Sequence, residues 1–142
     1  MLESFFIINA DYKQANDVCQ NISKTLFDMN IEAEDIASCE IAIREALNNV
    51  IKHAYQNRPN NKINLLISLK SKHITISISD FGKSRKSIKE ATLDFNPKDI
   101  ENLPEGGFGL YIIEKIMDTT EYKIENDKNT YIMTKLLKDK KH

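Results

Sequence analysis

Glycine placement is the feature that most constrains this chain of 142 residues. All four glycines lie in two short stretches, Asp80-Phe81-Gly82 and Gly106-Gly107-Phe108-Gly109-Leu110. Glycines that only make turns would be spread along the chain, whereas concentrated glycines mark places where the backbone approaches something closely. The fold is therefore expected to use both stretches for close contact.

A long amphipathic helix is predicted from Glu32 to about Asn57, because apolar residues recur there at three- and four-residue steps. Glu45, Asn49 and His53 are spaced four apart and so share a second face of this helix. A carboxylate and a carboxamide stacked there can serve a hard cation and a proton at once. Taken alone, the helix favours a solvated polar stripe with weak side-chain pairing, and the rest of the chain reverses that preference.

The other periodicities predict an α/β two-layer sandwich. Strands are expected at Ser4–Asn9, Ile63–Leu69, Ile74–Ile78, Glu121–Glu125 and Thr130–Leu137, and further helices at Tyr12–Met29, capped by Asp11, and Gly107–Met117. Ser71-Lys72 makes a hairpin of the second and third strands, and Asn126-Asp127-Lys128-Asn129 separates the last two. This element order favours a mixed, mainly antiparallel sheet covered on one face by three helices.

Asp80 falls on the expected core side of its strand, because it shares the even-numbered positions of three isoleucines. Burying a lone carboxylate is costly unless it is hydrogen-bonded, so a donor is expected, and the exocyclic amino group of a purine would serve. An aspartate that turns out to solvent or caps the Phe81-Gly82 turn is the alternative. The nearby glycine favours a binding role.

The segment from Lys83 to Glu105 lacks clear periodicity, and such a length within a compact domain is typical of a functional lid. The glycines that follow precede and open a helix, where free N–H groups and the positive end of the helix dipole attract phosphate oxygens. A tight loop between packed elements could use the same glycines.

Length and composition predict one domain over residues 1–142. The net charge of −1, with dispersed Lys and Arg, argues against direct nucleic-acid binding. No apolar run approaches the roughly 20 residues of a membrane span and no signal-type segment is found, so a cytoplasmic protein without a membrane partner is expected. Cys19 and Cys39 are expected to be small buried residues rather than a disulfide or a zinc site.

Three motifs in order carry a resemblance to a known family. Glu45-x-x-x-Asn49 on a helix, Asp80-x-Gly82 after a strand and Gly107-x-Gly109 opening a helix resemble the N, G1 and G2 boxes of the GHKL ATP-binding superfamily, which has the Bergerat fold. Within it, residues 44–55 and 105–118 look most like the bacterial anti-sigma-factor serine/threonine kinases. The similarity covers nearly the whole chain.

The resemblance implies a role for each matched position. Asn49 would bind Mg²⁺ through its amide oxygen, with the metal bridging the triphosphate of ATP. Glu45 would be the general base that takes the proton from the attacking hydroxyl. Asp80 would recognise the adenine amino group, and Gly82 would let the backbone pass close to the base. Further nucleotide contacts are expected at Gly106, Gly107, Phe108, Gly109, Leu110 and, beside the adenine, Thr130.

Two departures from the family pattern concern charge and backbone around the lid. A Lys-Ser-Arg run follows Gly82 where the family often has a second glycine, and Pro104-Glu105 stand where some relatives have an arginine for the terminal phosphate. The candidates for that cation are Lys83, Arg85 and Lys98. His53 is expected to be structural, with support of the Mg²⁺ shell as the alternative.

The function that the resemblance implies is an anti-sigma factor and serine/threonine kinase that binds a sigma factor and phosphorylates an anti-anti-sigma (STAS-domain) protein. Two alternatives stay open: an ATP-binding regulatory module without phosphotransfer, and a detached histidine-kinase catalytic domain. A homodimer through the first strand or helix is expected from the two-sided apolar run Phe5–Ile8.

Overall fold

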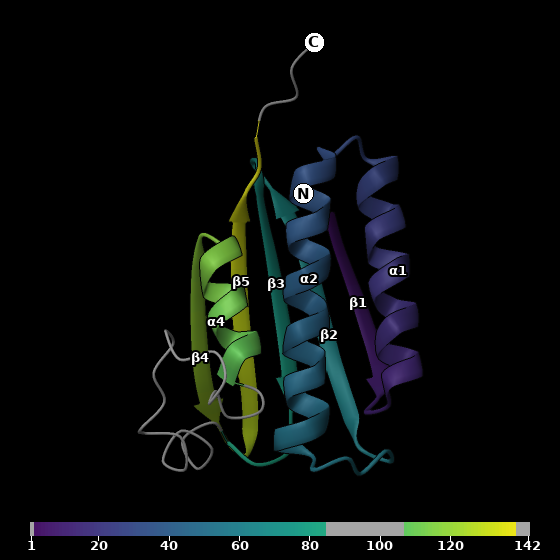
Figure 1. Ribbon diagram of the computed structural model, residues 1–142, viewed down its shortest axis with the longest axis vertical. Helices are drawn as coiled ribbons and strands as arrows, with labels where there is room; N and C mark the ends of the chain where they lie inside the picture. Colours follow the sequence, from purple (N-terminus) through teal and green to yellow (C-terminus); the bar gives the residue numbers. More distant parts are fainter. Residues whose placement is uncertain (1, 85–106, 139–142) are drawn as a thin grey trace.

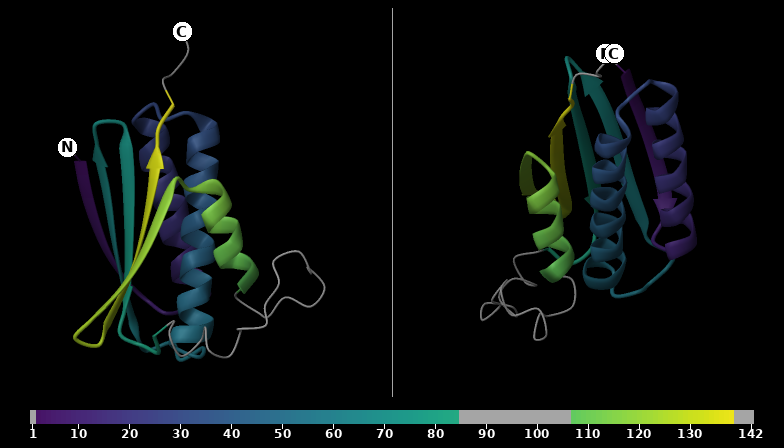
Figure 2. Two further views of the ribbon diagram at one scale, coloured as in Figure 1. Left: turned by 90° about the vertical axis from the view of Figure 1, so that its left-hand side faces the viewer. Right: turned by 45° about the horizontal axis from the view of Figure 1, so that its top comes forward.

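The computed structural model describes residues 2–84 and 107–138, which form a layer of helices on one face of a five-stranded sheet (Figure 1). The strands are β1 (Leu2–Asn9), β2 (Lys62–Lys70), β3 (His73–Asp80), β4 (Thr119–Glu125) and β5 (Lys128–Leu136), and the helices are α1 (Tyr12–Asp28), α2 (Ala33–Asn49) and α4 (Gly107–Ile116). A π-helical turn, η1 (Val50–Ala54), continues α2. The predicted two-layer sandwich is confirmed (Figure 2).

The strand order across the sheet is β1-β2-β3-β5-β4, and all four neighbouring pairs are antiparallel. The two antiparallel helices α1 and α2 return the chain to the end where β1 stops, so β2 runs back alongside β1. In Figure 1, α1 lies on the β1 side, α2 over the middle of the sheet and α4 on the side of β4 and β5. This topology brings β3 beneath the end of α2.

Both hairpin turns are tight two-residue turns. Ser71 and Lys72 have φ values of 47° and 65°, and Asn126 and Asp127 have φ values of 48° and 66°. Such left-handed pairs match the twist of the flanking strands. Because Asn126-Asp127 completes the second turn alone, β5 begins at Lys128, two residues earlier than the sequence predicted.

The end of the long helix also differs from the prediction. Regular α-helix stops at Asn49, and the next turn is wider, with the Tyr55 N–H donating to the Val50 carbonyl at 2.9 Å. A π-type turn closes over five residues rather than four. The shared face predicted for Glu45, Asn49 and His53 therefore keeps α-helical geometry only for the first two.

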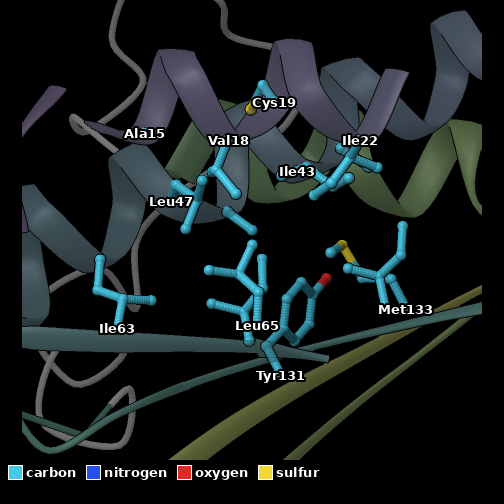
Figure 3. Packing of buried hydrophobic residues seen from close by; sticks show 14 of the residues in the cluster. Ala15, Val18, Cys19, Ile22, Ile43, Leu47, Ile63, Leu65, Tyr131 and Met133 are labelled. Carbon is cyan, nitrogen blue, oxygen red and sulfur yellow. The ribbon is translucent and has the colours of Figure 1, made fainter. Parts of the chain in front are cut away.

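Among the described residues, one cluster of buried apolar side chains joins the two layers. Figure 3 shows side chains from α1 and α2, such as Ile22 and Leu47, opposite Leu65 of β2 and Met133 of β5. Tyr131 also extends from β5 toward the helices. This core fixes α2 over the central strands, which is what positions the site.

The two cysteines belong to this core as free thiols, as predicted. Burial raises the pKa of the Cys19 thiol to about 11 and that of the Cys39 thiol to about 12. Neutral thiols are poor nucleophiles and poor metal ligands. Their role is packing.

The remaining sequence predictions concern the lid and the membrane. The expected lid at about 83–105 falls, apart from Lys83 and Ser84, outside the described residues. Within residues 2–84 and 107–138, no helix is both long and apolar enough to cross a bilayer.

Candidate functional site

Asp80 is buried at the end of β3, with 5% of its surface exposed. Its Oδ1 accepts hydrogen bonds from the Gly82 N–H and from the Asn129 side-chain amide, both at 2.9 Å. The Asn129 amide also donates to the Gly82 carbonyl at 3.0 Å. The predicted core-side position of Asp80 is confirmed, and the carboxylate caps the Phe81-Gly82 turn from inside the protein rather than from solvent.

Asn129 is a residue that the sequence analysis assigned only to a turn. It is 2% exposed and lies directly opposite Asp80 in the β3–β5 register. The position of Asn129 could have been inferred in two steps. Asn126-Asp127 alone is sufficient for the turn, so residue 129 belongs to the last strand. Antiparallel pairing of that strand with β3 then places residue 129 beside residue 80.

The side chain of Thr130, which was predicted to contact adenine, lies on the opposite face of the sheet from Asp80. Its hydroxyl is 3.0 Å from the Ser79 hydroxyl. Since neighbouring side chains alternate across a strand, Ser79 and Thr130 share the sheet face opposite to Asp80 and Asn129. The structure therefore does not bring Thr130 to Asp80, and Asn129 takes that place.

Gly82 makes its close approach to the protein itself. A Cβ atom at this position would lie 2.3 Å from the Ala54 carbonyl oxygen and 2.8 Å from the Tyr55 ring. The next residue, Lys83, donates its N–H to the same Ala54 oxygen at 2.8 Å. The first glycine box is thus docked against the last turn of η1, which any side chain at position 82 would prevent.

The Tyr55 hydroxyl holds the Phe81-Gly82 turn in place by hydrogen bonds. Its hydroxyl accepts from the Phe81 N–H at 2.8 Å and donates to the Lys62 carbonyl at 2.6 Å. Burial raises the pKa of the Tyr55 hydroxyl, which keeps it protonated and able to donate. The start of β2 and the end of β3 are held at a fixed separation as a result.

A narrow pocket of about 10 Å³, roughly the space of one water molecule, lies between the end of α2 and the sheet. It is lined by Ala46, Asn49, Val50, Ala54, Ile78, Asp80, Lys83, Tyr122 and Tyr131. Two predicted site residues, Asn49 and Asp80, therefore share one pocket.

The pocket also contains residues that the sequence analysis did not assign. Tyr122 and Tyr131 face each other across β4 and β5 and present aromatic surface to it. Of the three candidate cations, Lys83 lines the pocket, whereas Arg85 and Lys98 fall outside the described residues. Tyr131 could have been found from the sequence, because it is an aromatic residue at a core-facing position of the last strand.

Glu45 and the second glycine box meet where α2 packs beside α4. A Cβ atom at Gly109 would lie 2.7 Å from the Glu45 Oε2. Gly107 begins α4, as predicted, and Leu110 packs against the core. Phe108 belongs to the first turn of α4, and Gly106 lies outside the described residues.

His53 has a structural environment. Its Nε2 is buried without a hydrogen-bond partner among the described residues. Burial, followed by the neighbouring Lys52 charge, lowers the His53 pKa. A neutral imidazole is therefore favoured, in keeping with the structural role predicted for it.

The fold is that of the histidine kinase-like ATPase class. The family model described as the histidine kinase-like ATPase domain matches residues 8–135. Similar proteins identify the family within this class. The chain spans about two thirds of their length. Serine-protein kinase RsbW of Oceanobacillus iheyensis is 37% identical over 108 residues, which are 74% of this chain and 67% of that protein. The Staphylococcus aureus (strain MSSA476) RsbW is 39% identical over 111 residues, 74% and 68% of the two chains.

The chain belongs to the RsbW family of serine-protein kinases, and by class it is an ATP-dependent protein kinase. The predicted resemblance to GHKL ATPases and anti-sigma-factor kinases is thereby confirmed.

Solved structures share the fold. The RsbU and RsbW domains of Rv1364c from Mycobacterium tuberculosis align with a TM-score of 0.69 at 17% identity, over 96% of this chain and 33% of that chain. The SiaB-SiaC complex from Pseudomonas aeruginosa aligns with a TM-score of 0.63 at 11% identity, over 93% and 88%.

Proposed function

We propose that this chain is an anti-sigma factor that binds a sigma factor and, using ATP and Mg²⁺, phosphorylates a serine or threonine of an anti-anti-sigma (STAS-domain) protein. Membership of the RsbW family supports the kinase class. The observation that carries the proposal is that Asn49, at the end of α2, and Asp80, which Asn129 holds, line the same pocket.

Adenine recognition falls to Asp80. Because Oδ1 already accepts from Gly82 and Asn129, the carboxylate is fixed before a nucleotide arrives, which reduces the ordering cost of binding. Asp80 then accepts a hydrogen bond from the exocyclic amino group of adenine. Asn129 is the residue that holds Asp80 in this orientation.

Asn49 suits a magnesium site. It is 7% exposed, it lines the pocket, and no hydrogen bond from the described residues holds its side-chain amide. The described residues contain no group of three or more His, Cys, Asp or Glu placed to hold a metal ion. Mg²⁺ is commonly held by one or two protein oxygens together with phosphate and water, so Asn49 with the triphosphate fits this ion. When bound, the ion would neutralise charge on the phosphates.

Glu45, one turn before Asn49, is the proposed general base. Its carboxylate accepts the proton of the substrate hydroxyl while that oxygen bonds to the γ-phosphorus of ATP and the bond to ADP breaks. Lys83 is the described cation available to the phosphates.

Nucleotide binding is tested by titration with ATP and Mg²⁺, with GTP as the base-specificity control. Wild-type protein is expected to prefer ATP, and Asp80→Asn to weaken ATP binding by about tenfold or more, the equivalent of one lost charged hydrogen bond. Ser79→Ala changes the other face of the same strand and is the matched control. Equal affinity for ATP and GTP would contradict the role of Asp80.

Phosphotransfer is tested with a purified anti-anti-sigma protein. Glu45→Ala is expected to slow transfer by about 10²–10⁴-fold with ATP affinity retained. Acid-stable phosphoprotein supports serine or threonine as the acceptor, whereas acid-labile phosphoprotein would favour the histidine-kinase alternative. ATP binding without any phosphoprotein would favour the regulatory-module alternative.

The proposed homodimer uses the uncovered face of the sheet. Phe5 and Ile7 of β1 are each 60% exposed there, and Leu66 lies opposite Phe5 on β2. Light scattering is expected to give a dimer mass for the wild type and a monomer mass for Phe5→Ser with Ile7→Ser. Phe27→Ser on α1 is the control for dimerisation through the helix. A monomeric wild type would remove this proposal.

A further inference from the structure

Gly109 lies in the first turn of α4, against the side chain of Glu45. A Cβ atom at Gly109 would be 2.7 Å from Glu45 Oε2, 3.6 Å from its Cδ and 3.7 Å from its Cβ. The space that a side chain would fill at position 109 is therefore occupied by one acidic side chain of α2. Gly109 itself is buried, and Glu45 is half-buried.

Helix geometry does not require a glycine here. Gly109 lies inside α4 and does not adopt the left-handed conformation that other residues avoid. A glycine inside a helix costs roughly 0.5–1 kcal/mol relative to alanine. The position is thus locally unfavourable, and the only described group that a methyl would displace is the Glu45 side chain.

We propose that Gly109 is a positioning residue, whose missing side chain lets the Glu45 carboxylate lie against the first turn of α4. This inference rests on the proposed role of Glu45 as general base. The same helix turn carries the free N–H groups expected to face the phosphates. Gly109 thereby sets the distance between the base on α2 and the phosphate-binding end of α4.

The size of the effect follows from the contact distance. A methyl at position 109 would push Oε2 from 2.7 Å to at least the 3.4 Å at which ordinary contact begins, a shift of about 0.7 Å. A misplacement of about 1 Å can reduce a rate by about 10²-fold. Because the displaced atom is the end of a flexible side chain, the fold can accommodate the change.

The first experiment compares Gly109→Ala with wild type. The catalytic rate is expected to fall by about 10–100-fold while the Kd for ATP changes less than about twofold. The melting temperature should stay the same or rise, because alanine favours the helix. Glu114→Ala, an exposed substitution on the same helix, is the control and should keep the wild-type rate.

A double-mutant cycle separates this role from direct phosphate contact. In a Glu45→Ala background, adding Gly109→Ala should cause no further loss of rate. Combining Gly109→Ala with Glu45→Asp, whose side chain is one methylene shorter, should recover more rate than the product of the single effects. The same loss in both backgrounds, or weaker ATP binding in Gly109→Ala, would overturn the proposal.

The rates of the single variants distinguish a wrong assignment of Glu45 as general base from a wrong assignment of Gly109. If Glu45→Ala alone kept the wild-type rate, the proposed function of Glu45 would be wrong, and the positioning role of Gly109 with it. If Glu45→Ala were slow but Gly109→Ala were unaffected, only the positioning role would be wrong.

Discussion

Asp80, which lines the pocket, and Asn129 lie 49 residues apart in the sequence and share a buried hydrogen bond. In Asn129→Ala, Asp80 and the Gly82 carbonyl both lose a buried donor. The free energy of unfolding is expected to fall by about 1–3 kcal/mol. ATP affinity should fall as well, since the carboxylate is no longer held in place. Chemical denaturation and nucleotide titration measure the two effects.

Thr130→Ala is the matched control, because Thr130 is the next residue along β5 and faces the opposite side of the sheet. It should leave ATP affinity nearly unchanged. Weaker ATP binding in Thr130→Ala than in Asn129→Ala would contradict the supporting role of Asn129 and favour the predicted contact of Thr130 with adenine.

The lowered pKa of His53 predicts that the stability of the folded protein depends on pH. Its pKa is lowered in the folded protein from the ordinary value of 6.5, chiefly by burial. The unfolded chain therefore binds more protons below pH 6.5, and stability falls as the pH is lowered from there toward the folded pKa. The slope should stay below about 1.4 kcal/mol per pH unit, the limit for one proton.

Urea denaturation at several pH values between about 7.5 and 5 measures this slope. His53→Asn should reduce it. An unchanged slope in His53→Asn would contradict the assignment.

The contrast between Asp80 and Asn129 shows what a sequence reveals at this scale. The burial of Asp80 was predictable because strand parity is local and Ile74, Ile76 and Ile78 define the core side. The partnership with Asn129 was not, because it depends on which strand pairs with β3 and on a turn shorter by two residues. A one-residue change in register would have exchanged Asn129 for Thr130.

The two glycine boxes use glycine for different reasons at the level of elements. At Gly82 a Cβ would meet the main chain of η1, 2.3 Å from the Ala54 oxygen. Gly82→Ala must therefore separate β3 from η1 and is expected to cost about 1–3 kcal/mol of stability, as overpacking does. Gly109→Ala meets only a flexible side chain and should cost little. Chemical denaturation of the two variants tests whether Gly82→Ala loses more stability than Gly109→Ala.

The end of α2 shows where periodicity fails as a guide. Apolar residues continue at helical spacing through Ala54, so the pattern predicted one helix to about Asn57. A π-type turn changes the hydrogen-bond step by a single residue, which a short apolar pattern does not resolve. The wider turn is nevertheless part of the site, because its last carbonyl, at Ala54, receives Lys83.

At the scale of the whole molecule, a buried carboxylate links the two layers. Asp35, in the first turn of α2, is 1% exposed and accepts the Lys138 N–H at 3.0 Å, just beyond β5. Asp35→Ala is expected to reduce the free energy of unfolding by about 1–3 kcal/mol, since the hydrogen bond from the Lys138 N–H to a charged carboxylate is lost. Denaturation with urea measures the loss.

Glu34→Ala provides the control, because Glu34 bonds the same residue through an exposed ion pair at 2.8 Å. Exposed pairs contribute about 0–1 kcal/mol. If both variants lost the same stability, the buried link would have no special role.

The architecture was predictable from alternating strands and amphipathic helices, but the strand order was not. Apolar periodicity identifies the side of each strand that faces the core and carries no information about its neighbours. The insertion of β5 between β3 and β4 is therefore a property of the folded sheet. The pocket depends on it, because β5 supplies Tyr131 to the lining and Asn129 as the partner of Asp80.

The placement of β5 has a consequence for synthesis on the ribosome. Asp80 is made well before Asn129, so a growing chain has the central strand but not the partner that orients its carboxylate. A nucleotide bound in the proposed way, by Asp80 held in place by Asn129, would stabilise only chains in which β5 has already docked, and would then favour the native state by mass action. On that proposal, ATP stabilises the folded form only after the last strand has been made.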